Sequence, residues 1–332
     1  MKFTFIIVSY NEKEYLEQAI KSCLSQKLDD FEIVIGDDGS NDGSIDLIMK
    51  YAEQYPNIIR YSVSDRTGIG SCKDIIASLR VSDVITRALK MARGEYCVVL
   101  SGDDYFYEGT FFKNAISFLD RNPDYVTYVG EYEKVWEDHT VHSDQITYPR
   151  KLYWAKKYIH LSAFVFRKAV FEKGAFLQRF CDDIGLQYSL AISGKWKYEH
   201  VLMFAYRQRN SSIMHEIDRL EFDIVELMIF QDTLCKGKFY IQSMARFGGP
   251  LRRVFEQRDK LVNDKYKKYL SNCKKYDCDI LKKICDYDHY TGIQKGKFLM
   301  WINYTRICGF LYFIMERAYN LVYKCLRACN IN

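Results

Sequence analysis

Two pairs of adjacent carboxylates stand where apolar runs of the sequence end. Asp103 and Asp104 follow an apolar run at 95–100, and Asp37 and Asp38 close another. Neighbouring carboxylates repel each other, and a hard divalent cation with oxygen ligands relieves that repulsion. Such a cation usually keeps coordination positions for substrate phosphates, so the pattern predicts a nucleotide diphosphate as partner. A bare Asp-Asp pair is more often a solvated turn or a helix cap, and its place after a strand favours chemistry.

Strands that alternate with helices must position these acids. Continuous apolar runs predict the strands, and apolar residues at helical spacing predict the helices between them. The alternation is typical of an α/β fold with a mostly parallel sheet flanked by helices. The predicted strands are 3–11, 31–35, 58–63, 95–100, 125–135 and 161–166, and the predicted helices are 12–26, 44–54 and 82–92.

Polar turns follow three of the strands, with the sequences SYN, GDDGS and SGDDYF. In an open α/β sheet the ligand crevice lies outside the carboxyl ends of the strands. The three turns are therefore expected to converge at one edge of the sheet. Residues 66–82 form a longer stretch than a strand-to-helix connection requires, and they are predicted to form a loop insertion that can include one helical turn. Strand signals fade from about residue 216, where helical patterns continue to the end.

The composition indicates a folded globular protein. Of the 332 residues, 48% are hydrophobic and 27% are charged, which is unlike a disordered chain. The net charge of +5 is too small to indicate nucleic-acid binding. The 11 cysteines include no Cys-x-x-Cys pair, and the amino-terminal sequence lacks the features of a signal peptide. These observations predict a cytoplasmic location with reduced thiols.

Six stretches of the sequence together resemble the family 2 glycosyltransferases of the GT-A fold, in the order found in that family. They are FIIVSYNEKEYLEQAIKSCLSQ, FEIVIGDDGSNDGS, ARGEYCVVLSGDDYF, HLSAFVFRK, DDIGLQYSLAISGK and YRQRNSSI. The resemblance, to bacterial polysaccharide-synthesis members, implies a GT-A, Rossmann-like catalytic domain at 1–213. A helical C-terminal region is expected at 214–332.

The resemblance also implies which residues hold the nucleotide, namely Val8, Tyr10, Asn11, Glu12 and Asp38. Tyr10 would stack on the base, and Asp38 would accept a hydrogen bond from an imino N–H. Such contacts favour uracil, so a UDP-sugar is the expected donor.

Asp103 and Asp104 are implied to be the acids next to the metal and the diphosphate, with Mn²⁺ or Mg²⁺ as the ion. Many members of the family carry a further acid where this chain has Ser101, so either carboxylate remains a candidate for the direct ligand. Arg207 and Arg209 stand where many relatives have Arg-x-His. Arginine can neutralise a leaving pyrophosphate by bidentate hydrogen bonding, but it has no lone pair for a metal. The alternative is two solvated surface arginines.

Inverting transfer needs a general base that takes the proton of the acceptor hydroxyl. The acidic stretch FCDDIGLQ resembles the family's position for that base, with Asp183 the first candidate and Asp182 the second. The alternative is that these acids cap a helix at 184–192. His160 and Trp154 are weaker candidates for the acceptor side, where structural roles are the default.

The segment 295–327 combines aromatic and aliphatic residues with cations. Charged residues interrupt its apolar run too often for a membrane-spanning helix. The composition suits a helix lying on anionic lipid at the inner face of the cell membrane. A helix docked on the catalytic domain, or a homodimer contact, is the alternative.

These features together predict an inverting, metal-dependent glycosyltransferase. It would move a sugar from a UDP-sugar to a hydroxyl of a saccharide or lipid-linked oligosaccharide in surface polysaccharide synthesis. A non-catalytic sugar-nucleotide-binding or scaffold protein on the same fold is the alternative. A nucleotidyltransferase is disfavoured, because SYNEKEY lacks the glycine-rich, basic signature expected after the first strand.

Overall fold

The computed structural model of the chain describes residues 1–65, 77–136, 141–144, 159–172, 183–209, 219–235, 240–262 and 279–328. Two units emerge: Met1–Thr147 with Tyr158–Glu216, and Tyr148–Lys157 with Ile217–Asn332. The predicted boundary after residue 213 falls within 210–218, outside the described residues.

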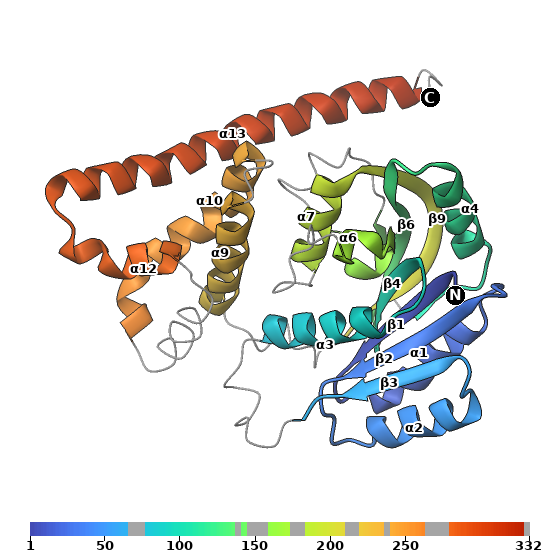
Figure 1. The fold of residues 1–332 in the computed structure, drawn as a ribbon. Helices are drawn as coiled ribbons and strands as arrows, with labels where there is room; N and C mark the ends of the chain where they lie inside the picture. The colour runs from blue at the N-terminus through green and yellow to red at the C-terminus, as the bar shows by residue number, and fades with distance from the viewer. Residues whose placement is uncertain are drawn as a thin grey trace. The chain divides into compact units, whose positions relative to one another are not determined.

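The first half of the sheet is parallel, as predicted. It consists of β1 (Phe3–Ser9), β2 (Phe31–Asp37), β3 (Ile59–Val63) and β4 (Tyr96–Ser101), in the order β3-β2-β1-β4. Val8 pairs in register with Gly36 of β2 and with Ser101 of β4. The carboxyl ends of these three strands therefore lie level with one another, and the turns that follow them start at the same edge (Figure 1).

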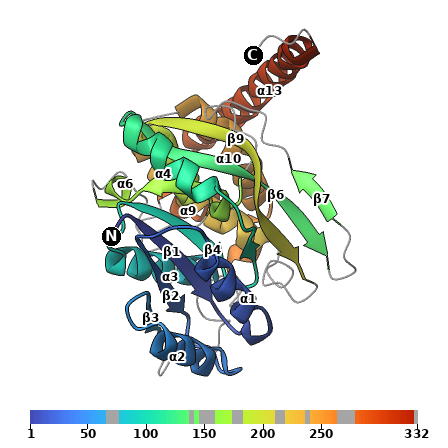
Figure 2. The ribbon, with the colours of Figure 1, turned by 90° about the vertical axis from the view of Figure 1, so that its right-hand side faces the viewer.

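Helices cover both faces of this half-sheet, with α1 (Lys13–Leu24) and α2 (Ser44–Gln54) on one face and α3 (Ala77–Met91) on the other (Figures 1 and 2). A Cβ on Gly36 would lie 2.6 Å from Cγ1 of Val84, so glycine allows α3 to pack closely on β2. The loop predicted at 66–82 is wrong for 77–82, which form the start of α3; 66–76 lie outside the described residues.

The second half of the sheet is mixed rather than mostly parallel. It contains β5 (Tyr105–Phe106), β6 (Tyr125–Trp136), β7 (Val141–Asp144), β8 (Phe164–Arg167) and β9 (Lys195–Gln208). β8 is antiparallel to β4, and β9 runs parallel to β6. The strand predicted at 161–166 begins instead with a 3₁₀ turn, η2 (Leu161–Ala163). Helices α4 (Phe111–Arg121), α6 (Ala169–Glu172) and α7 (Asp183–Ser193) complete this part.

Strand β9 was not predicted from the sequence, because an apolar run at 201–205 breaks the alternation typical of a half-buried strand. In the structure Val201 and Leu202 are exposed, whereas Met203, Phe204 and Ala205 are buried. Phe204 and Ala205 pair with β5, and β9 also pairs with β6.

Aromatic packing holds β5 beneath α1. The rings of Phe5 and Phe112 meet edge to face with centroids 5.0 Å apart, and Phe106 lies 4.9 Å from Phe112 in the same way. Such pairs contribute about 0.5–1.5 kcal/mol each beyond their buried area. The N–H of Phe106 also donates to Ser22 Oγ in α1 at 3.1 Å. These contacts fix the turn that joins β4 to β5 and carries Asp103 and Asp104.

The second unit is helical in its described part, as predicted. Its elements are α9 (Arg219–Cys235), α10 (Tyr240–Glu256), η3 (Arg258–Val262), α12 (Asp279–Cys285), η4 (Asp286–His289) and α13 (Gly292–Ala328). The buried carboxylate of Asp223 accepts two hydrogen bonds from Arg253, which ties α9 to α10. None of the helices in the described part of the chain has the length and apolar content needed to cross a bilayer.

Candidate active site

The turn after β4 presents the acid pair at the edge of the sheet. Gly102 N donates to the carbonyl of Val8 at 2.8 Å, which fastens the turn to the end of β1. A Cβ at Gly102 would overlap Oε2 of Glu12, so only glycine lets that carboxyl lie against the turn. The pair Asp103-Asp104 thus follows a glycine for a steric reason.

Asp104 is fully buried and is held by β9. Its Oδ1 accepts a hydrogen bond from the backbone N of Arg207 at 2.8 Å. Its Oδ2 has no hydrogen-bond partner among the described residues, and it lies 3.7 Å from Nε2 of His160. Burial raises the pKa of Asp104 well above its usual value, and the negative charge of Asp103 adds to the effect.

His160 lies behind the acid pair. Its side chain is about 6% exposed, and its Nδ1 accepts from Ser162 N at 3.3 Å. Burial lowers its pKa to about 3, so the ring is neutral and carries its proton on Nε2, toward Asp104. Its ring packs 4.3 Å from that of Tyr206. The structure therefore places His160 against a carboxylate and an aromatic ring rather than at a surface for an acceptor.

Asp103 is paired with an arginine. Oδ2 of Asp103 lies 2.6 Å from Nη2 of Arg209, and the same nitrogen lies 3.2 Å from Oε1 of Glu12. Burial and the charge of Asp103 raise the pKa of Glu12 well above its usual value. Glu12, predicted to touch the nucleotide, thus belongs to the acid cluster at the strand ends.

Arg207 lies near the end of β9 and is held by contacts from three directions. Besides its backbone bond to Asp104, its guanidinium donates to the carbonyl of Asp103 and, at 2.7 Å, to Gln18 Oε1. The guanidinium also lies 4.6 Å from the centroid of Tyr15. It is therefore not a solvated surface arginine.

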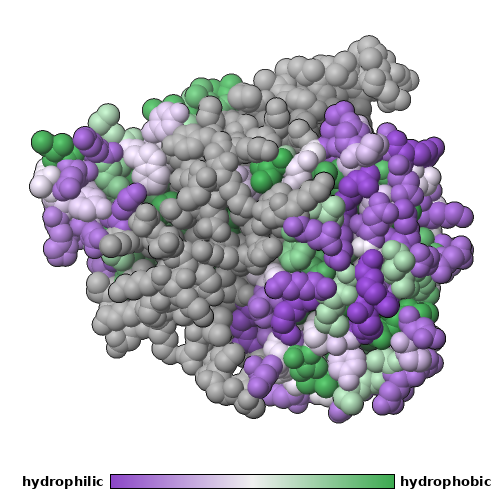
Figure 3. Space-filling view, in the orientation of Figure 1, coloured by the Kyte–Doolittle hydropathy of each residue, from purple (hydrophilic) through white to green (hydrophobic). Residues whose placement is uncertain are grey.

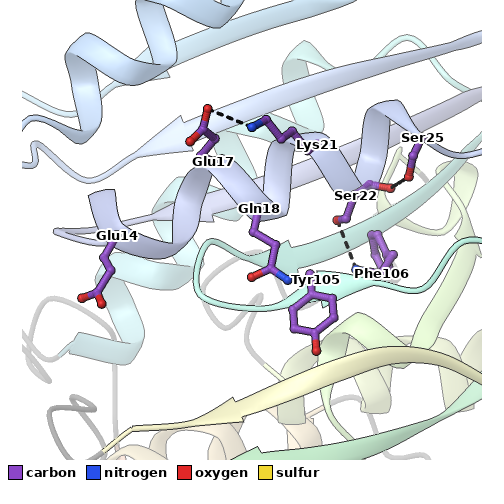
Figure 4. A pocket seen from close by; sticks show the side chains of 8 residues that line it. All are labelled: Glu14, Glu17, Gln18, Lys21, Ser22, Ser25, Tyr105 and Phe106. Carbon is purple, nitrogen blue, oxygen red and sulfur yellow. Dashed lines mark hydrogen bonds and ion pairs between the residues drawn. The ribbon is translucent and has the colours of Figure 1, made fainter. Parts of the chain in front are cut away.

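A hollow of about 520 Å³, lined by residues of α1 and β5, adjoins this contact (Figure 4). Gln18 and Tyr105 both line it, and Arg207 reaches these two residues from the acid cluster. Glu17 and Lys21, also in its lining, pair with each other at 3.1 Å. The hollow is therefore lined by two of the residues that contact the Arg207 guanidinium, Gln18 and Tyr105.

The predicted base-binding residues gather around an arginine that the sequence did not reveal. Arg80 of α3 donates to the carboxylate of Asp38, and its guanidinium lies 5.5 Å from the centroid of Tyr10. Arg80 lies 42 residues from Asp38, within the segment predicted to be a loop. No spacing rule connects the two, so the tertiary fold alone brings Arg80 to this place.

Asn11 and Asp37 both shape the turns at the ends of β1 and β2. Asn11 has a left-handed backbone (φ 52°), and its Oδ1 accepts from Asn41 N at 2.9 Å. The carboxylate of buried Asp37 accepts from both the N and Oγ of Ser40 at 2.7 Å. The two acids at the end of β2 therefore have different partners. Asp37 stabilises the turn, and the Asp38 carboxylate accepts from Arg80. A cavity of about 510 Å³ opens beside these turns, lined by Asn11, Glu12, Lys13, Glu14, Tyr15, Asp42 and Arg209.

Asp183 begins α7 and shares its surroundings with the acid pair. Its Oδ1 accepts from the N of Leu161 at 2.5 Å. Burial, together with the charges of Asp104, Asp183 and Asp103, raises the pKa of Tyr206 to about 12. Leu161 follows His160, whose Nε2 lies 3.7 Å from Oδ2 of Asp104, so neighbouring residues contact Asp183 and Asp104. Asp182 and Trp154 lie outside the described residues.

A sequence model described as Glycosyl transferase family 2 matches residues 4–180, which is more than half of the chain. The chain belongs to this family. The chain is 30% identical over 130 residues to the minor teichoic acid biosynthesis protein GgaB of Bacillus subtilis, covering 39% of this chain and 13% of GgaB. It spans less than half the length of the curated relatives that it matches.

Two solved structures share the fold of this glycosyltransferase. The crystal structure of S. aureus TarS 1-349 in complex with UDP-GlcNAc has a TM-score of 0.56 at 17% identity, covering 94% of this chain and 91% of that one. The mannosyltransferase PcManGT from Pyrobaculum calidifontis, in complex with GDP-Man and Mn²⁺, has a TM-score of 0.51 at 12% identity, covering 93% and 87%. The predicted GT-A fold is thereby confirmed.

A divalent ion, which the family implies, would find suitable oxygen ligands in the glycosyltransferase's acid cluster. Oδ2 of Asp104 and Oε2 of Glu12 are buried without a hydrogen-bond partner in the described part of the chain. The described residues nevertheless hold no group of three or more His, Cys, Asp or Glu side chains placed to bind an ion. Magnesium-like ions usually bind through one or two carboxylates plus substrate phosphates. The donor set therefore fits an ion that arrives with a diphosphate.

Proposed function

We propose that the protein is an inverting glycosyltransferase that moves a sugar from a UDP-sugar to a hydroxyl group of a saccharide or lipid-linked acceptor. One observation carries the proposal: Oδ1 of Asp183 accepts from the N of Leu161 at 2.5 Å, and the neighbouring His160 has its Nε2 3.7 Å from Oδ2 of Asp104. A diphosphate-facing acid pair and a candidate base thus share one site, as a single displacement at a sugar carbon requires.

The donor's base would lie against Tyr10, Arg80 and Asp38 at the ends of β1 and β2, with Val8 beside them. A carboxylate that accepts from an imino N–H, next to a planar guanidinium that donates, complements the alternating edge of uracil. TarS, which shares the fold of this chain, was crystallised in complex with UDP-GlcNAc, and this agrees with a UDP-sugar as the donor.

The diphosphate would lie over the acid cluster. Asp103 would hold a Mn²⁺ or Mg²⁺ ion, with Asp104 behind it, and the ion would offset the charge that builds on the leaving group. Arg207 would donate to a diphosphate oxygen, since its guanidinium is already fixed beside the cluster.

Asp183 would act as the general base. The acceptor oxygen attacks the anomeric carbon, the bond from that carbon to the diphosphate oxygen breaks, and the acceptor's proton passes to the Asp183 carboxylate. Because the attack comes from the face opposite the leaving group, the configuration at that carbon inverts. The bond from Leu161 N to Oδ1 orients the carboxylate.

The acceptor would belong to a cell-surface polymer, and α13 would bring the enzyme to the membrane where such polymers are assembled. One face of α13 is buried, with Phe298, Ile302, Thr305 and Cys308 inside the second unit. On the other, large apolar residues are 48–74% exposed: Ile293, Met300, Ile307, Phe310, Leu311 and Ile314. Figure 3 has apolar residues at the surface along the first half of this helix.

The charge of the α13 sequence supports an anionic surface as partner. Its cations are Lys295, Lys297, Arg306, Arg317, Lys324 and Arg327, against the single acid Glu316. Each Lys or Arg near such a surface contributes about 1 kcal/mol, while a homodimer through this helix would bring like charges together. The membrane is therefore preferred over the homodimer.

The test is release of UDP from a panel of UDP-sugars in the presence of Mn²⁺ and oligosaccharide acceptors, with Asp183→Asn as the matched variant. Asparagine keeps an oxygen for Leu161 N, so the fold is retained and only the base is lost. Transfer should fall by about 10²–10⁴ while UDP affinity is unchanged. Near-normal transfer by the variant would show that Asp183 is not the general base. Binding of UDP-sugars by the wild type without turnover would favour a non-catalytic protein.

A further inference from the structure

Arg209 is the cation that neutralises Asp103 in this structure. One guanidinium nitrogen contacts carboxylate oxygens of both Asp103 and Glu12, at 2.6 and 3.2 Å. All three side chains are only 12–14% exposed, so these contacts are shielded from solvent. Poorly hydrated ion pairs are screened little by salt, so this one persists at physiological ionic strength.

Arg209 is also held in position by stacking. Its guanidinium lies 5.0 Å from the centroid of Tyr15, whose ring also supports Arg207 at 4.6 Å. The two arginines therefore share one aromatic anchor. Arg209 can turn away from Asp103 toward an incoming anion without losing this anchor, because a ring face accepts a guanidinium over a range of positions.

A divalent ion and the Arg209 guanidinium would compete for Asp103. A guanidinium offers no lone pair, so Arg209 cannot join the coordination of the ion. It would instead be a like charge next to it. The ion can bind Asp103 well only after Arg209 has moved to another anion, and the donor's diphosphate is such an anion.

We infer that Arg209 is a tethered cation that occupies Asp103 in the free enzyme and is transferred to the donor's diphosphate, which opens Asp103 to the metal ion. The inference rests on the proposed function. Its consequence is thermodynamic coupling: the diphosphate strengthens ion binding, and the ion strengthens diphosphate binding by the same factor.

The experiment measures Mn²⁺ binding to the full chain by electron paramagnetic resonance of free Mn²⁺, with and without UDP. A protein-free blank corrects for the complex of Mn²⁺ with UDP. Wild-type protein should bind Mn²⁺ weakly alone and at least tenfold more tightly with UDP. Arg209→Gln should bind Mn²⁺ without UDP at least tenfold more tightly than wild type, and UDP should change its affinity less. Arg209→Lys, which keeps the charge, should resemble wild type.

Arg87→Gln is the control, because Arg87 is a half-buried arginine of α3 whose partners, Asp83 and Ser64, lie outside the acid cluster. Equal Mn²⁺ affinity of wild type and Arg209→Gln without UDP would overturn the inference, as would tight Mn²⁺ binding by wild type alone. The wild-type comparison needs no variant, so it stands if Arg209→Gln does not fold. UDP binding measured by calorimetry at saturating Mn²⁺ separates the two failures. If UDP binds but wild type and Arg209→Gln have equal Mn²⁺ affinities without UDP, this inference alone is wrong. If UDP does not bind, the proposed function is wrong as well.

Discussion

The backbone N–H of Arg207 donates to Oδ1 of Asp104 at 2.8 Å, across 103 residues of chain. This bond joins the end of β9 to the turn after β4. It orients a carboxylate that is fully buried and whose other oxygen faces the neutral ring of His160. The acid pair is thus positioned by a strand far away in the sequence as much as by its own turn.

Asp104→Asn should remove transfer while leaving the fold intact. Asparagine keeps the oxygen that accepts from Arg207 N and has nearly the same shape, but it cannot carry the negative charge. We expect the turnover number to fall by about 10²–10³, the scale seen when one preorganised electrostatic group is removed. Turnover is measured with the preferred UDP-sugar, and folding by circular dichroism.

Glu108→Gln is the control for this variant, because Glu108 lies four residues further on and pairs with Lys27 at the surface. It should transfer sugar like the wild type. A folded Asp104→Asn protein with near-normal turnover would show that the charge of Asp104 has no part in the reaction.

Arg80→Gln should weaken donor binding. The substitution removes the guanidinium that contacts both Asp38 and the ring of Tyr10. Because these groups lie at the predicted base site and not at the reacting carbon, we expect KM for the UDP-sugar to rise about tenfold with kcat little changed, a loss of roughly 1.4 kcal/mol of binding.

Arg87→Gln, two turns along the same helix, should leave KM unchanged. The measurement is a full saturation curve for each protein. A fall in kcat at constant KM would place Arg80 in the chemical step instead of in base recognition.

The acids of the site, together with Arg207 and Arg209, were predicted from the sequence, whereas Arg80 was not. Asp103 and Asp104 follow a continuous apolar run, and such a run predicts both a strand and a turn at its end. Arg80 gives no such signal, because it precedes the predicted helix at 82–92 and no spacing rule connects it with Asp38. Arg207 was found by resemblance, yet its strand was not predicted, since the apolar run at 201–205 breaks the alternation. The position of Arg80 and the strand that carries Arg207 both depend on contacts with residues far away in the sequence.

Glu32 offers a test of stability away from the site. It lies near the amino end of β2, where its buried carboxylate accepts from Thr4, Arg60 and Arg93. Burial alone would raise its pKa, but these hydrogen bonds outweigh burial and the pKa is lowered. Glu32→Gln should lower the free energy of unfolding at pH 7 by about 3 kcal/mol, as expected when one partner of a buried ion pair is removed.

The difference should depend on pH in a defined direction. Because the pKa of Glu32 is lowered in the folded protein, its carboxylate stabilises the fold at pH values above the unfolded pKa of about 4.3. That stabilisation disappears as the pH falls through the folded pKa. Urea unfolding at pH 7, 5 and 3 should therefore show the gap between wild type and Glu32→Gln closing at the lowest pH, with Glu53→Gln as a surface control. A gap that is constant with pH would mean that packing, not charge, is what Glu32 contributes.

The exposed face of α13 should bind vesicles of anionic lipid. Ile307 and Phe310 are 57% and 64% exposed, and burying such side chains contributes about 1.5–3 kcal/mol each when burial is complete. Replacing both, Ile307→Ser with Phe310→Ser, should weaken co-sedimentation with phosphatidylglycerol vesicles at least tenfold, and salt should weaken wild-type binding through the cations. Val141→Ser, at an exposed position on β7, is the control. If the double variant instead shifts a dimer to a monomer in analytical ultracentrifugation and vesicles bind neither protein, the face is a contact between two copies of the chain and the membrane proposal is wrong.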